Sequence, residues 1–213
     1  MNFSLLCTRL SGILTRGESG NLPVSHLLKG VNLYLIGMMG SGKTTVGRLL
    51  AQQLSYRFFD TDAVIEQATA QSISQIFAES SEAVFRQLET QVLAQLSSRK
   101  NLAIATGGGI VLERSNWSYL HHGIVVWLDV PIDQLHQRLQ QDQTRPLLQD
   151  TDLVQKLQTL LDQRQKLYAQ ADVRVIVAER ETPEEIAIRT LEEIKKVLKP
   201  ETSHLADLPA DLN

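Results

Sequence analysis

The sequence contains a single cysteine, Cys7, among its 213 residues. One cysteine cannot form a disulfide within the chain, so a disulfide-held scaffold is excluded and a reducing compartment is expected. Long hydrophobic runs are also missing, since no apolar stretch approaches the roughly 18 residues of a transmembrane helix. We therefore expect a cytoplasmic protein with no membrane partner.

An excess of basic residues is lacking as well. The chain has 21 Lys and Arg against 24 Asp and Glu, so its formal net charge is −3. Because no overall positive field attracts nucleic acid, we expect no nucleic-acid partner. An anionic small molecule would have to be bound by individual arginines instead.

Acidic residues are scarce near the N-terminus, where residues 1–29 contain only Glu18 and several hydroxyl side chains. We expect this segment to be a disordered extension or the product of a start codon assigned too early. A transit peptide, which would place the protein in an organelle stroma, is the alternative. The polar segment 200–213 is expected to form a flexible C-terminal tail.

Between these segments, short apolar runs alternate with longer amphipathic ones. Strands are expected at 31–36, 57–59, 102–105, 124–128 and 173–177, and helices at 43–54, at 62–98, from Pro131, at 152–170 and from Pro183. Strands that alternate with helices predict a parallel sheet with helices on both faces. We expect one α/β domain over residues 30–199.

A glycine-rich motif, Gly37 to Thr44 (GMMGSGKT), follows the first expected strand and matches G-x-x-x-x-G-K-[ST]. Glycines allow a tight loop whose N–H groups converge on a phosphate, and the next helix adds its positive dipole end. This context disfavours a glycine-rich turn matched by chance. The expected ATP-binding residues are Gly40, Ser41, Gly42, Lys43, Thr44 and Thr45, with Lys43 on the β- and γ-phosphates and Thr44 on Mg²⁺.

Four further segments carry polar or glycine residues at the ends of expected elements. They contain Asp60 with Asp62, Arg86, the glycines 107–109, and the pair Arg145 and Arg164. Two carboxylates at i and i+2 leave a strand end toward the same side. Taken singly, each segment has an ordinary explanation: a helix cap supplied by Thr61 or Asp62, an exposed helix face, a turn, or a loop charge.

In this order and at these spacings, the segments resemble the shikimate kinase family over nearly the whole of 30–199. The resemblance implies a three-layer P-loop kinase fold with a five-stranded sheet and a mobile lid. It implies transfer of the γ-phosphate of ATP to the 3-hydroxyl of shikimate, which gives shikimate 3-phosphate and ADP, a step toward chorismate and the aromatic amino acids. The implied partners are ATP and shikimate, with one Mg²⁺ per subunit, and we expect a monomer.

The resemblance also implies a role for each segment. Asp60 supports the metal through water, whereas Asp62 binds the acceptor hydroxyl and is the candidate base. Arg145 belongs to the lid and reaches the ATP phosphates, so that Lys43, Asp62 and Arg145 form the catalytic set. The shikimate-binding residues are Asp62, Arg86, Gly107, Gly108, Gly109 and Arg164, with the two arginines on the carboxylate.

The chain departs from the family motif G-E-x-x-F-R-x-x-E in one place, because Ser81 stands at the position of the glycine. The substitution leaves the local turn uncertain. The adenine pocket is only weakly indicated, by Arg138 and the segment 180–183. Two alternatives stay open: another small-molecule kinase on the same scaffold, such as a gluconate or nucleoside monophosphate kinase, and a non-catalytic nucleotide-binding module.

Overall fold

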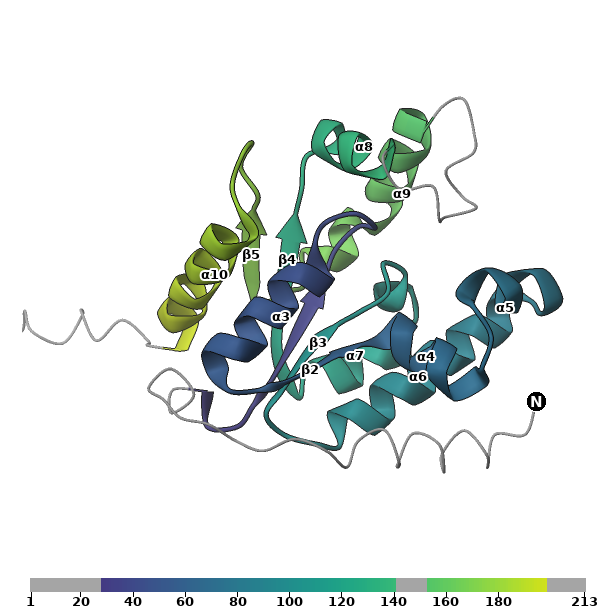
Figure 1. Ribbon diagram of the computed structural model, residues 1–213, viewed down its shortest axis with the longest axis horizontal. Coiled ribbons are helices and arrows are strands. Elements are labelled where there is room, and N and C mark those ends of the chain that lie inside the picture. Colours follow the sequence, from purple (N-terminus) through teal and green to yellow (C-terminus); the bar gives the residue numbers. More distant parts are fainter. Residues whose placement is uncertain (1–27, 141–152, 199–213) are drawn as a thin grey trace, which may run out of the picture.

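A five-stranded, all-parallel sheet forms the centre of the molecule (Figure 1). The computed structural model describes residues 28–140 and 153–198. The strands are β1 (Asn32–Ile36), β2 (Arg57–Asp60), β3 (Leu102–Ala105), β4 (Gly123–Asp129) and β5 (Val173–Ile176), in the order β2-β3-β1-β4-β5. The predicted sheet is therefore confirmed. The domain boundaries at residues 30 and 199 stay predictions.

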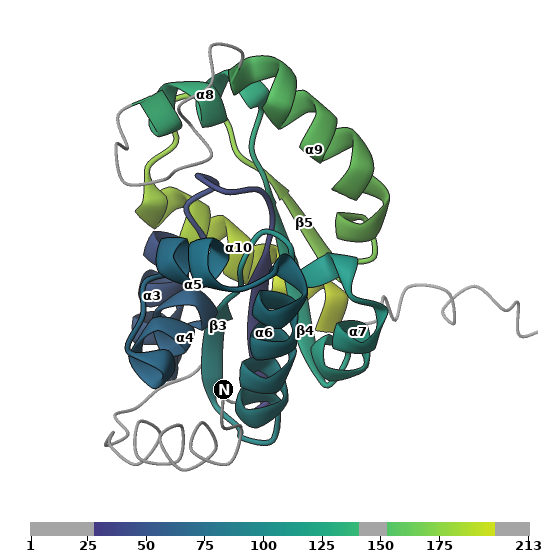
Figure 2. The same cartoon turned by 90° about the vertical axis from the view of Figure 1, so that its right-hand side faces the viewer.

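Helices cover both faces of the sheet, as predicted (Figures 1 and 2). They are α3 (Lys43–Leu54), α4 (Thr61–Thr69), α5 (Ile73–Glu79), α6 (Glu82–Ser97), α7 (Arg114–Leu120), α8 (Ile132–Gln140), α9 (Leu153–Tyr168) and α10 (Pro183–Leu198), with a 3₁₀ turn η1 (Ile110–Leu112). Helices α3 and α10 pack on one face, and α6 and α7 on the other. All five side chains of β1 are buried, which explains why the four residues after Asn32 form a continuous apolar run rather than an alternating one.

The stretch 62–98 was expected to be helical, and the structure divides it into three helices with two breaks that were not expected. Helix α4 ends at Thr69, and its C-cap Ala70 has a left-handed φ of 55°. Ser72 then caps α5 in a reciprocal capping box with Gln75. A second break follows at Ser80 and Ser81, which are both extended. Apolar residues continue at helical spacing through both breaks, so the periodicity did not reveal them. Helix α7 and the turn η1 were not expected at all.

The extended backbone at Ser81 also explains the departure from the family motif. Ser81 has φ −83° and ψ 158°, a conformation open to any residue, and it precedes the first turn of α6. A glycine is therefore not required here, and the doubt about the local turn is removed. The helix that carries Arg86 begins directly after it, at Glu82.

The ends of several elements agree with the sequence-based expectation. Helix α3 and strand β3 have the predicted bounds, and α10 begins at Pro183. There the Glu185 N–H donates to Thr182 Oγ1 at 3.3 Å, and the Thr182 N–H donates to Glu185 Oε2 at 2.8 Å. Within the two described ranges, no helix combines the length and the hydropathy that crossing a membrane requires.

The strand order places three loops side by side. Strand β3 lies between β1 and β2, and all three run in the same direction. Their carboxyl ends therefore bring the glycine-rich loop after β1, the carboxylates after β2 and the glycines after β3 to one edge of the sheet. Open α/β sheets bind ligands at this edge.

Candidate active site

The phosphate-binding motif forms a tight loop between β1 and α3. Gly37, Gly40 and Gly42 have φ values of 139°, 76° and 89°, which favour glycine. A Cβ at Gly37 would lie 2.6 Å from the Leu128 carbonyl oxygen. Helix α3 begins directly after Gly42, with no acidic residue in its first turn. The loop therefore directs backbone N–H groups and the positive end of a helix dipole at one point, as an anion site requires.

Lys43 is held over this loop. Its side chain is largely buried, and Nζ donates to the carbonyl oxygens of Gly37 and Met38 at 2.9 and 2.7 Å and to Ser41 Oγ at 3.2 Å. These acceptors are neutral, whereas phosphate oxygens are charged and make stronger hydrogen bonds to an ammonium group. The lysine is thus kept at the loop in a position from which it can exchange neutral acceptors for phosphate.

Two side chains with oxygen atoms that could bind a metal ion lie next to the loop. Thr44 Oγ1 donates to Asp60 Oδ2 at 2.7 Å, and Asp60 Oδ1 accepts from the N–H groups of Asp62 and Ala63 at 3.0 and 3.4 Å. Asp60 is therefore the N-cap of α4, and the alternative that Thr61 or Asp62 caps this helix is wrong. A hydroxyl and a carboxylate beside a phosphate site suit Mg²⁺, which takes few protein ligands and completes its shell with water and phosphate oxygens.

Asp62 lies against the glycine triplet. It stands in the first turn of α4, and a Cβ added to Gly107 would come within 2.9 Å of its Oδ1 atom. The preceding residue fixes this approach, because the Gly107 N–H donates to the buried hydroxyl of Thr61 at 3.0 Å. Because Asp60 supplies the helix cap, the carboxylate of Asp62 is not needed for that purpose and faces the glycines.

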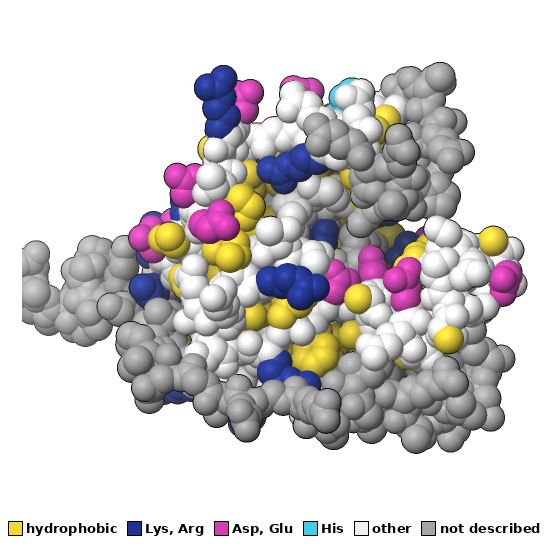
Figure 3. All heavy atoms as spheres, in the orientation of Figure 1, with side chains coloured by type: hydrophobic (Ala, Val, Ile, Leu, Met, Phe, Trp, Pro, Cys, Tyr) yellow, Lys and Arg dark blue, Asp and Glu magenta, His cyan; other side chains and the backbone are white. Residues whose placement is uncertain are grey.

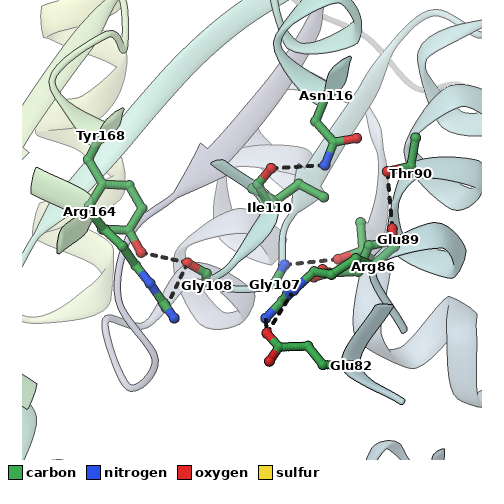
Figure 4. Close-up of polar contacts among 11 residues, drawn as sticks. Glu82, Arg86, Glu89, Thr90, Gly107, Gly108, Ile110, Asn116, Arg164 and Tyr168 are labelled. Atoms are coloured by element: carbon green, nitrogen blue, oxygen red, sulfur yellow. Dashed lines mark hydrogen bonds and ion pairs between the residues drawn. The ribbon is translucent and has the colours of Figure 1, made fainter. Parts of the chain in front are cut away.

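Arg86 reaches the same triplet from α6. Its guanidinium packs against Gly109 so closely that any side chain there would displace it. Nη1 forms an ion pair with Glu89, while Nε and Nη2 donate to Glu82 Oε1 at 3.3 and 2.9 Å. The arginine is thus oriented by two carboxylates of its own helix (Figure 4).

Arg164 approaches from the opposite side, on α9. Its guanidinium is largely buried, and Nη1 donates to the Gly108 carbonyl oxygen at 3.2 Å. Its Nε atom is buried with no hydrogen-bond partner among the described residues. This buried donor is therefore available to an acceptor that is not among the described residues. The two arginines therefore flank the glycine triplet from two helices that are far apart in sequence (Figure 4).

Glu89 is a site residue that the sequence reasoning did not assign. Its side chain is almost completely buried beside Gly107, and Oε1 has no hydrogen-bond partner within the described ranges. Burial raises its pKa to about 7; the charge of Arg86 opposes this shift and that of Asp62 adds to it. The final glutamate of the motif around Arg86 was the available signal, and its place one helical turn after the arginine predicts contact between them.

The raised pKa of Glu89 predicts a pH-dependent stability. Between its ordinary pKa of 4.5 and about 7, the folded state holds a proton that the unfolded state has lost. The contribution of this group to the free energy of unfolding is therefore full below pH 4.5 and is lost as the pH rises through 7. Urea unfolding between pH 5 and 7.5 should show a steeper loss of stability in the wild type than in Glu89→Gln.

Glu184→Gln is the matched control for that comparison, because Glu184 is exposed in the first turn of α10. This variant should follow the wild-type slope. If the Glu89→Gln and wild-type curves run parallel over the whole range, Glu89 does not bind the proton.

Arg138, which weakly indicated the adenine pocket, lies at the nucleotide side. Arg138 Nη1 donates to the Gly40 carbonyl oxygen at 3.3 Å, and burial lowers the pKa of this guanidinium. It therefore borders the phosphate loop. Arg145 and the rest of the expected lid, around residues 140–150, lie outside the described residues apart from Gln140.

Apart from Arg145, the structure thus brings the expected site residues together around one hollow. Acidic and basic side chains gather around this hollow on the face shown in Figure 3. The phosphate loop, Thr44 and Asp60 form one wall, and Asp62, the glycine triplet and the two arginines form the other. Such a site can hold a polyphosphate on one side and a small carboxylate-bearing molecule with hydroxyl groups on the other.

Comparison with known proteins identifies the family. The family model described as shikimate kinase matches residues 39–195. A shikimate kinase of Nostoc punctiforme is 61% identical over 181 residues, which cover 85% of this chain and 100% of the relative. One of Thermosynechococcus vestitus is 58% identical and covers 84% of this chain and 98% of the relative.

Solved structures give the same result. The shikimate kinase of Acinetobacter baumannii in complex with shikimate has a TM-score of 0.76 and 41% sequence identity, and the match covers 81% of this chain and 97% of that one. A gluconokinase of Sinorhizobium meliloti shares the fold at a TM-score of 0.54 with only 16% identity, over 79% of this chain and 94% of that one.

Proposed function

The chain belongs to the shikimate kinase family, and from this premise we propose that the protein phosphorylates shikimate in the hollow described above. It is an ATP-dependent kinase whose acceptor is an alcohol group. The observation that carries the assignment of the acceptor is the pair of arginines, Arg86 and Arg164, on either side of the glycine triplet (Figure 4), against which Asp62 also lies.

The two arginines determine how the acceptor is placed in the site. Guanidinium groups bind carboxylates through paired, charge-assisted hydrogen bonds, so two of them determine both the position and the orientation of the ring. The glycines leave a surface without side chains, on which a flat ring can lie close to backbone N–H groups. Bound in this way, shikimate presents its 3-hydroxyl toward Asp62.

Asp62 accepts the proton of this hydroxyl. The hydroxyl oxygen then forms a bond to the γ-phosphorus of ATP, the bond from that phosphorus to the β–γ bridging oxygen breaks, and ADP leaves. Phosphoryl transfer depends mainly on positioning and on neutralisation of charge, so Asp62 need not be a strong base. The alignment of the acceptor hydroxyl with Asp62 therefore matters more than the basicity of its carboxylate.

Lys43 and the loop N–H groups stabilise the phosphate oxygens as charge moves to the leaving ADP. Thr44, with Asp60 acting through water, would hold one Mg²⁺, which supplies neutralisation of phosphate charge when bound. Arg145 is proposed to reach the same phosphates, on the resemblance alone. Closure of the expected lid would exclude water, which otherwise competes with the acceptor for the phosphoryl group. The monomeric state and the cytoplasmic location also remain predictions.

The proposal is tested by a coupled assay of ADP release with Mg·ATP. The assay compares shikimate, gluconate and no acceptor at equal concentrations. We expect strong turnover with shikimate and only background with the other two. Release with gluconate alone would move the acceptor to another kinase family of the same fold. Tight ATP binding without acceptor-dependent release would favour the non-catalytic module.

A further inference from the structure

We propose that Tyr168 is a positioning residue for the acceptor carboxylate: its hydroxyl orients the peptide between Gly108 and Gly109 and fixes Arg164 beside it. The inference rests on the proposed function. Tyr168 lies at the C-terminal end of α9, four residues after Arg164, so both side chains leave the same face of the helix. Both converge on the Gly108 carbonyl oxygen (Figure 4).

The tyrosine is rigidly held. It is fully buried, and its ring stacks on Trp127 at a centroid distance of 5.7 Å and an angle of 27°. The Trp127 ring is itself covered by the guanidinium of Arg174 at 4.6 Å, and Arg174 is paired with Asp129 at 2.6 Å. A ring packed in this way cannot reorient without disturbing β4, so its hydroxyl is a fixed reference point for the glycines.

The hydroxyl donates to the Gly108 carbonyl oxygen at 2.6 Å. Burial raises the pKa of Tyr168, which keeps the hydroxyl protonated and able to donate. The peptide between Gly108 and Gly109 is trans, so its carbonyl and its N–H point in opposite directions. Holding the carbonyl toward α9 therefore directs the Gly109 N–H away from α9. Arg86 packs against this same glycine.

Holding this peptide in one orientation matters because glycine restricts backbone conformation less than any other residue. Without the tyrosine hydroxyl, the one hydrogen bond left to the Gly108 carbonyl from the described residues is the longer one of 3.2 Å from Arg164 Nη1. Both the aim of the Gly109 N–H and the position of the Arg164 guanidinium would then be less well defined. The consequence should fall on the acceptor carboxylate more than on the nucleotide, because the hydroxyl reaches the phosphate loop only through a weak contact of 3.8 Å with Met38 Sδ, whereas its hydrogen bond to Gly108 is 2.6 Å long.

Tyr168→Phe tests the inference, since it removes the hydroxyl and keeps the stacked ring. We expect the KM for shikimate to rise about three- to tenfold, which is the effect of one lost hydrogen bond. The KM for ATP should stay at the wild-type value. Thr190→Val is the matched control: Thr190 is fully buried on α10, and its hydroxyl donates to the Ile186 carbonyl oxygen at 2.6 Å. It should lose a similar amount of thermal stability with no change in either KM.

An unchanged shikimate KM in Tyr168→Phe, with turnover intact in the wild type, would overturn the inference and leave the proposed function standing. Equal rises in both KM values would overturn it too, because they would indicate a general structural role. A wild-type protein that does not use shikimate at all would overturn the proposed function, and this inference with it.

Discussion

Replacing Asp62 with Asn is expected to lower shikimate-dependent turnover by about a hundredfold or more, in the range for loss of a general base. The amide has the shape of the carboxylate but cannot accept the proton of the acceptor hydroxyl. ATP binding should be unchanged, because Asp60, and not Asp62, contacts Thr44 beside the phosphate loop. Steady-state kcat, together with nucleotide binding measured by calorimetry, checks both parts of the expectation.

Asp162→Asn is the control for that variant. Asp162 is an exposed acid on α9 that contacts only Gln158 among the hydrogen bonds of the described residues. It should turn over at the wild-type rate. A kcat for Asp62→Asn within a few-fold of the wild-type value would remove Asp62 from the role of base and would leave positioning as its sole contribution.

Replacing Arg164 with Ala is expected to weaken shikimate binding by about ten- to hundredfold, the effect of losing a hydrogen bond to a charged group. The guanidinium is largely buried and its Nε atom has no acceptor within the described part of the chain, so the ligand carboxylate would be its missing partner. ATP affinity should change little. Titration calorimetry with each ligand separately measures the two affinities.

Lys166→Ala provides the comparison, because Lys166 lies two residues further along α9 and is exposed. Its loss removes a positive charge from the same helix without touching the glycine triplet. Shikimate binding as weak in this variant as in Arg164→Ala would show that general charge, rather than a specific contact, attracts the acceptor.

The phosphate side of the site was largely predictable from sequence. A motif with fixed glycine positions determines its own local geometry, and Gly37, Gly40 and Gly42 have the left-handed φ values that such a loop needs. The bounds of α3 were correct because the motif leads directly into the helix. The prediction depended on backbone conformation, which a short segment of sequence encodes by itself.

The acceptor side was predictable only in part. Arg86 and Arg164 were identified by resemblance, but their approach to Gly109 and Gly108 depends on how α6 and α9 pack on the sheet. Glu89 and Tyr168 were not assigned for the same reason. Residues that face the core of a helix recur at the same sequence spacing whether they pack against apolar neighbours or make a buried polar contact. The breaks at Ala70 and Ser81 were missed because tertiary packing continues across them.

The strand order separates the two halves of the reaction within one sheet. The donor contacts belong to the loop after β1, the start of α3 and the end of β2, whereas the acceptor contacts come from the start of α4, the glycines after β3, and helices α6 and α9. Substitutions in the acceptor half need not alter the donor loop. An evolving lineage can therefore exchange one hydroxylated acceptor for another while its phosphate-binding residues stay unchanged. In this architecture, acceptor specificity can thus change more freely than phosphate binding.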